Sequence, residues 1–114
     1  MDALVVVSES PMNSVRVAES IRIAIGLMTY MDEIGILFTG DAVWALGGLK
    51  PEKGTTMATS LDQVEKFISY GQKVLADRES CDNRSVAPAI EGVKVVGAKE
   101  AIDAISKAKH VVTM

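Results

Sequence analysis

The stretch Gly71-Gln-Lys-Val-Leu-Ala-Asp-Arg-Glu-Ser-Cys-Asp-Asn-Arg-Ser-Val86 contains a helix end, a short strand and a polar segment in succession. Gly71 is suited to end the preceding helix, because glycine readily takes the left-handed conformation that follows a last helical turn. Val74-Leu75-Ala76 is a short apolar run, which predicts a buried strand over 73–76, and 77–86 is predicted to be a loop. Ligands of parallel α/β sheets bind beyond the carboxyl ends of the strands. We therefore expect functional side chains in this loop.

The segments before this stretch follow the same alternation. Ala3–Val7 is a continuous, largely β-branched run, which is typical of a strand buried on both faces. Apolar residues at helical spacing predict a helix over 17–28, with Asn13 or Ser14 as its cap. Further elements are predicted as a strand over 33–38, one or two helical turns over 41–46, an exposed loop over 50–59, and a helix that begins at Ser60 with a capping box.

After the stretch, the pattern predicts a strand over 93–96, a helix over 98–108 and a strand over 110–114. Strands that alternate with helices imply right-handed crossovers and a mostly parallel sheet. We therefore predict a three-layer α/β/α sandwich around a sheet of about five strands. At 114 residues, the chain is expected to form a single domain, 1–114.

Composition excludes several classes of function. The formal net charge is -3 at pH 7, and no basic cluster is present to bind nucleic acid or an anionic membrane. No apolar run is long enough for a membrane helix, and the N-terminus does not read as a signal peptide. The single cysteine cannot form an internal disulfide, which fits a reducing compartment. We therefore expect a cytoplasmic protein.

Signatures of cofactor and metal binding are also missing. The sequence has neither the phosphate-binding loop G-x-x-x-x-G-K-[ST] nor the dinucleotide fingerprint G-x-G-x-x-G. Its one histidine and one cysteine lie far apart and give no metal-ligand spacing. The sequence therefore predicts no cofactor and no metal site.

Cys81 is the one candidate nucleophile in the chain. Thiols react as thiolates, and nearby positive charge lowers the thiol pKa. Arg78 and Arg84 lie three positions to either side and could supply that charge, whereas Glu79 and Asp82 oppose it. The local sequence is compatible with a reactive thiol and with a packed or partly exposed one that has no chemistry.

Two other sets of residues are candidates for binding. Ser8 and Ser10 follow the first strand, where they could bind a small anion or cap the next helix. Trp44 lies in an apolar segment with Val43 and Leu46. This segment could pack onto the sheet or form a subunit interface, in which tryptophan is enriched.

Three stretches together resemble the DsrE/DsrF-like family of small sulfur-relay proteins. They are Ile34-Gly-Ile-Leu-Phe-Thr-Gly-Asp-Ala-Val43, the run from Lys73 to Val86, and the tail from Gly92-Val-Lys-Val to Ala108-Lys-His-Val-Val112. The resemblance covers nearly the whole chain. It implies a parallel α/β sheet, a sulfur donor or acceptor protein as partner, and homo-oligomers (trimers or hexamers) or hetero-oligomers with related subunits.

The chain departs from the family pattern at two positions. The glycine of the family's Arg-Gly signature is Ser85 here, and the active cysteine of sulfur-carrying members corresponds to Asp77. One hypothesis is that Cys81 carries sulfane sulfur as a persulfide, with Gly40 and Asp41 shaping the neighbouring loop. The alternative is a non-catalytic oligomer subunit or a small-ligand binding module of the same fold.

Overall fold

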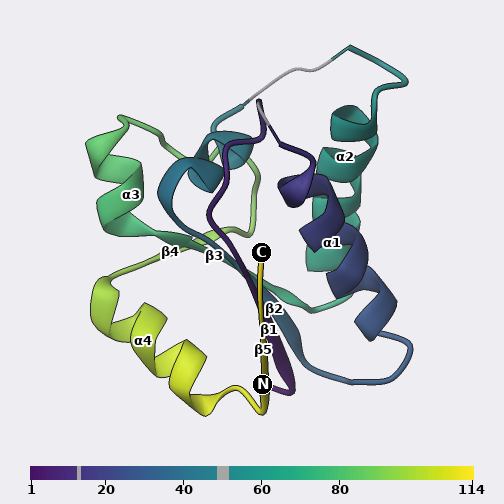
Figure 1. The fold of residues 1–114 in the computed structure, drawn as a ribbon, viewed down its shortest axis with the longest axis vertical. Coiled ribbons are helices and arrows are strands. Elements are labelled where there is room, and N and C mark those ends of the chain that lie inside the picture. Colours follow the sequence, from purple (N-terminus) through teal and green to yellow (C-terminus); the bar gives the residue numbers. More distant parts are fainter. Residues whose placement is uncertain (13, 49–51) are drawn as a thin grey trace.

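The computed structural model describes residues 1–12, 14–48 and 52–114. Helices and strands alternate along this part of the chain, as predicted (Figure 1). In chain order they are β1 (Ala3–Val7), α1 (Arg16–Leu27), β2 (Ile34–Phe38), the 3-10 helix η1 (Gly40–Leu46), α2 (Thr56–Ser69), β3 (Lys73–Asp77), α3 (Arg78–Asn83), β4 (Lys94–Val96), α4 (Ala98–Lys107) and β5 (His110–Thr113).

The strands form a five-stranded sheet in the order β4-β3-β2-β1-β5. Every pair of neighbours is parallel, so that Val5 of β1 lies opposite Ile36 of β2 on one side and Val112 of β5 on the other. The carboxyl ends of β1, β2 and β3 therefore meet along one edge of the sheet. The predicted parallel sheet of about five strands is confirmed.

Helices cover both faces of the sheet (Figure 1). On one face, α1 and α2 pack over β1, β2 and β3, and alternate strand residues such as Val5, Ile36 and Val74 form the larger part of the core with them. On the other face, Leu4, Leu37 and Leu75 form a smaller cluster against Ala101 of α4. The three-layer α/β/α architecture is therefore confirmed, and the alternation of buried side chains along each strand produces it.

The two faces are covered unequally. One face has both α1 and α2, whereas the face with the smaller cluster has α4. The side chain of Met1 supplements α4 by lying over Gly35, where a Cβ atom would come within 2.8 Å of the methionine sulfur. The apolar surface of this face is thus left partly uncovered toward the amino-terminal ends of the strands.

The predicted start of α2 is wrong, and the first turn of α1 is bonded differently from the predicted cap. Helix α2 begins at Thr56 rather than Ser60, because the Thr55 side chain already accepts a hydrogen bond from the backbone N–H of Ala58 at 3.2 Å. The predicted loop over 50–59 is shorter accordingly, and residues 50 and 51 lie outside the described residues. Helix α1 has Val15 at its N-cap, and the hydroxyl of Ser14, one residue earlier, accepts a hydrogen bond from the Arg16 N–H at 3.1 Å; Asn13 is not among the described residues.

Gly71 ends α2 as predicted. Its φ is +85°, its N–H bonds the carbonyl of Ile68, and the N–H of Gln72 bonds the carbonyl of Phe67. This pair of backbone bonds is the Schellman arrangement, which requires a left-handed residue at the first position beyond the helix. The chain can therefore turn directly from α2 into β3.

The predicted loop over 77–86 is largely a helix. Asp77 caps α3 (Arg78–Asn83) by accepting a hydrogen bond from the backbone N–H of Ser80 at 3.2 Å. At the other end, Val86 N–H bonds the carbonyl of Cys81 and Ser85 takes φ +52°, which again is a Schellman ending. Local capping at both ends thus makes a short helix from a segment whose polar composition indicates a loop.

Candidate functional site

The candidate site lies at the carboxyl ends of three neighbouring strands. Ser8 follows β1, Gly40 follows β2 after one intervening residue, and Asp77 ends β3. Gly40 has φ +55°, and a Cβ atom at this position would lie 3.3 Å from the carbonyl oxygen of Ser8. The turn after β2 is therefore closely fitted against the segment after β1, and glycine is the residue that this backbone conformation favours.

Ser80 connects these segments. Its hydroxyl lies 2.5 Å from Asp77 Oδ2, to which it donates, and it accepts a hydrogen bond from the Gly40 N–H at 2.9 Å. The Ser80 side chain is buried, and the hydroxyl of Thr39 lies 3.4 Å from it. Ser80 and Thr39 are residues of the candidate functional site that were not predicted from the sequence. The signal present in the sequence is the spacing Asp77-x-x-Ser80, which is the spacing of a helix N-cap and its partner.

Cys81 faces the interior. It is 3% exposed and belongs to the core cluster on the α1 side of the sheet. Burial raises the pKa of the Cys81 thiol above its ordinary value, and the carboxylates of Asp77 and Asp82 raise this pKa further, whereas Arg84 lowers it. A buried thiol with a raised pKa is a poor nucleophile at neutral pH, because the thiolate is the reactive form.

Arg84 joins α3 to η1. Its Nε lies 2.9 Å from Asp41 Oδ1, and its Nη1 donates to the carbonyl of Ser80 at 3.2 Å. Asp41 is half-exposed, so this ion pair is accessible to solvent on one side. Arg84 therefore lies near the thiol, as predicted, but its guanidinium is already paired with the Asp41 carboxylate.

The structure does not bring Arg78 to the thiol. Its Nη2 donates to the carbonyl of Val95 at 3.4 Å, across β4. The two arginines therefore contact different parts of the molecule, Arg78 the β4 strand and Arg84 the η1 helix. Of the two arginines predicted to lie near Cys81, only Arg84 supplies positive charge there.

Ser8 and Ser10 lie on the loop after β1. Ser8 is exposed, and the hydroxyl of Ser10 accepts a hydrogen bond from the Met12 N–H at 3.2 Å. Neither hydroxyl caps α1, whose N-cap is Val15. Ser8 thus lies beside the turn at Gly40, on the side of the site opposite α3.

The three residues predicted for an interface differ in how deeply their side chains are buried. Val43 and Leu46 are fully buried in the core, whereas Trp44 is 39% exposed. The segment therefore packs onto the sheet through Val43 and Leu46, and Trp44 is the member of the three that a partner can contact without rearrangement.

Across residues 1–12, 14–48 and 52–114, no group of three or more His, Cys, Asp or Glu side chains is arranged to hold a metal ion. In the same part of the chain, no helix has both the length and the apolar character needed to cross a membrane.

Comparisons with known proteins agree with this architecture. The ychN protein from E. coli has a crystal structure that is 26% identical in sequence, with 100% of both chains covered and a TM-score of 0.81. The conserved protein of unknown function BT1422 from Bacteroides thetaiotaomicron is 14% identical over 99% of this chain and 95% of its own, with a TM-score of 0.70, a likeness of fold. A comparison with curated proteins finds no match. The model of the DsrE/DsrF-like family matches residues 1–114. The chain belongs to the DsrE/DsrF-like family.

Proposed function

We propose that this protein is a cytoplasmic subunit of a sulfur-relay assembly that binds and positions its partner without itself carrying the sulfur. The observation that carries this proposal is the state of the only thiol: Cys81 is 3% exposed, and its pKa is raised by burial and by two carboxylates. Asp77 stands where the active cysteine of sulfur-carrying relatives is expected, and its carboxylate is used to cap α3. Family membership supports the relay context.

The partner surface proposed here is the exposed side of the candidate site. Trp44 provides an accessible aromatic side chain on η1, and the half-exposed Asp41 carboxylate lies on the same short helix beside Arg84. An aromatic anchor with a charged rim is typical of protein interfaces. The partner is one of two kinds. It is another copy of the chain within a trimer or hexamer, or it is a related subunit that holds the persulfide.

Measurement of the intact mass tests whether the folded protein carries sulfur on Cys81. We expect the folded protein, incubated with a polysulfide donor and freed of excess reagent, to gain no sulfur that dithiothreitol removes. The same treatment in denaturant should add sulfur to Cys81, and Cys81→Ser should gain none in either state. A stoichiometric, reversible gain of sulfur by the folded protein would refute the proposal.

The interface can be tested separately by analytical ultracentrifugation. Trp44→Ala should reduce the size of the assembly or make it dissociate at a higher protein concentration. The reason is that hot-spot tryptophans commonly contribute about 2 kcal/mol or more to the free energy of binding. Tyr70→Ala is a matched control, because Tyr70 is a large exposed aromatic residue at the end of α2. Equal behaviour of both variants would exclude the Trp44 surface.

A second candidate function is a relay in which Cys81 carries the sulfur. It is favoured by the position of Cys81 on a six-residue helix at the carboxyl end of β3, with Arg84 lowering its pKa. In that reaction the Cys81 thiolate attacks the outer sulfur of a donor persulfide. A new S–S bond forms on Cys81 while the donor's S–S bond breaks, and the donor leaves as a thiolate. This route requires α3 to move away from the core, and the mass experiment above decides between the two candidates.

A further inference from the structure

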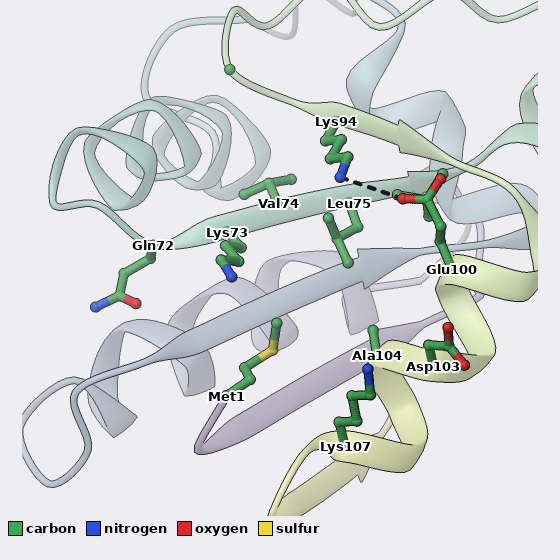
Figure 2. A pocket seen from close by; sticks show the side chains of 12 residues that line it. Met1, Gln72, Lys73, Val74, Leu75, Lys94, Glu100, Asp103, Ala104 and Lys107 are labelled. Carbon is green, nitrogen blue, oxygen red and sulfur yellow. Dashed lines mark ion pairs between the residues drawn. The ribbon is translucent and has the colours of Figure 1, made fainter.

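A groove of about 600 Å³ lies on the α4 side of the sheet, away from the candidate site. It is lined by the strands β3 and β4, by α4 and by Met1 (Figure 2). Lys73 and Lys94 are the first residues of β3 and β4, whereas Asp77 is the last residue of β3. Of β3 the groove uses Lys73, Val74 and Leu75, which precede Asp77, whereas its β4 lining extends to Val96, the residue opposite Asp77 in the sheet. Its volume falls within the range of small-molecule sites, about 300–1,000 Å³.

The floor of the groove is aliphatic. Leu75 of β3, Ala104 of α4 and the side chain of Met1 lie around the same part of the sheet (Figure 2). Leu75 belongs to the small core cluster of this face, and Met1 and Ala104 pack against that cluster while remaining half-buried. No aromatic side chain lines the groove. Such a floor suits an alkyl chain rather than a stacked ring.

Three lysines and two carboxylates are the charged groups at the rim. In Figure 2 the ammonium groups of Lys73 and Lys107 both point over the floor, from β3 and from α4. Lys94 is paired with Glu100 at 3.3 Å, but the ion pairs of the described residues include neither Lys73 nor Lys107. The two unpaired ammonium groups therefore leave positive charge on opposite sides of an apolar floor.

The remaining polar groups at the rim are those of Gln72 and Asp103. The amide of Gln72 is used within the fold, since its Oε1 accepts from the Ile34 N–H at 2.9 Å and its Nε2 donates to the carbonyl of Asp32 at 2.9 Å. The Asp103 carboxylate points away from the Lys107 ammonium in Figure 2. Apart from the Lys94–Glu100 pair, the rim thus holds two ammonium groups and one carboxylate, and its net positive charge favours a monoanion over a cation.

We propose that this groove binds a small aliphatic carboxylate, with its alkyl chain on Met1, Leu75 and Ala104 and its carboxylate at the rim, where Lys73 or Lys107 can reach it. The alkyl chain removes apolar surface from water, and the lysines supply charge-assisted hydrogen bonds. The site does not depend on the proposed relay role, because none of the residues around Cys81 and Asp41 takes part in it.

The test is a titration of the isotope-labelled protein with octanoate, followed by amide NMR shifts. We expect saturable shifts centred on Leu75, Ala104 and Lys107. Lys73→Met and Lys107→Met keep the aliphatic stems and should each weaken octanoate binding about threefold, and together about tenfold, as expected for partly exposed ion pairs. Lys99→Met is the matched control, since Lys99 is an exposed residue of α4 outside the groove.

Four results would overturn the proposal, three of them from the titration. These three are the absence of saturable shifts at millimolar octanoate, equally tight binding of octylamine, and equal weakening by Lys99→Met. Groove shifts that follow protein concentration in the absence of octanoate would also overturn it, because a second copy of the chain would then occupy the groove. Ala104→Glu, which places a carboxylate on the floor, should abolish octanoate binding, with circular dichroism as the check on folding.

Discussion

The hydroxyl of Ser80 accepts a hydrogen bond from the backbone N–H of Gly40 at 2.9 Å, and this contact ties α3 to the turn after β2. The same hydroxyl donates to Asp77, which caps α3. One buried side chain thus holds together the ends of two neighbouring strands. The orientation of α3, and with it the burial of Cys81, depends on this connection.

Removing this hydroxyl should destabilise the protein. We expect Ser80→Ala to lower the free energy of unfolding by about 1–3 kcal/mol, because the Gly40 N–H and the Asp77 carboxylate lose a buried partner. Urea denaturation followed by circular dichroism measures this change. Ser69→Ala removes an exposed hydroxyl from α2 and should change stability by less than about 0.5 kcal/mol. Similar losses in both variants would contradict the assigned role of Ser80.

The Asp77 carboxylate should control the reactivity of Cys81. Asp77→Asn keeps an oxygen that can cap α3 but removes a negative charge that raises the pKa of the Cys81 thiol. We therefore expect faster alkylation of folded Asp77→Asn by iodoacetamide at fixed pH. Unfolded wild type and unfolded Asp77→Asn, alkylated in urea, should react alike. An unchanged rate in the folded variant would mean that the Asp77 charge does not control the reactivity of this thiol.

The raised pKa of Cys81 also predicts a loss of stability in alkaline solution. The folded state retains the thiol proton at a pH at which the unfolded chain has released it, so the unfolded state binds fewer protons and stability falls as pH rises. The loss should begin above about pH 8.5, the ordinary pKa of a cysteine.

Comparison with Cys81→Ala isolates this effect from the titration of lysines and tyrosines. Urea denaturation of both proteins at neutral and alkaline pH should show a smaller decline for Cys81→Ala. A decline of the same size in both proteins would indicate that the thiol titrates alike in the folded and unfolded states.

Ser85 occupies a left-handed position with φ +52° at the end of α3. Because glycine takes this conformation without a steric penalty, Ser85→Gly should raise the free energy of unfolding by up to about 1 kcal/mol. Ser85→Val should lower it, since a β-branched residue is disfavoured there. Thermal unfolding of the two variants tests this pair. A clear loss of stability in Ser85→Gly would show that the Ser85 side chain makes a stabilising contribution of its own.

Much of the fold could be predicted, because hydrophobic periodicity is a local property of the chain. The buried run Ala3–Val7 and the helix stop at Gly71 both follow from residues within a few positions. Errors arose where two local signals competed. Thr55 and Ser60 both suit a helix cap, and the structure uses the earlier one. The segment after β3 has the composition of a loop, but caps at both ends make it helical.

The candidate site was only partly predictable, because its geometry depends on contacts between distant segments. The sequence by itself determined the five strands, the longer helices, the parallel sheet and the edge at which Ser8, Gly40 and Asp77 meet, since side-chain periodicity and strand direction are sufficient for these. Tertiary structure alone decided that Cys81 points into the core and that Arg84 pairs with Asp41, 43 residues away. The rotation of α3 against β3 and η1 selects which of its side chains are buried. Sequence spacing around Cys81 does not encode that rotation.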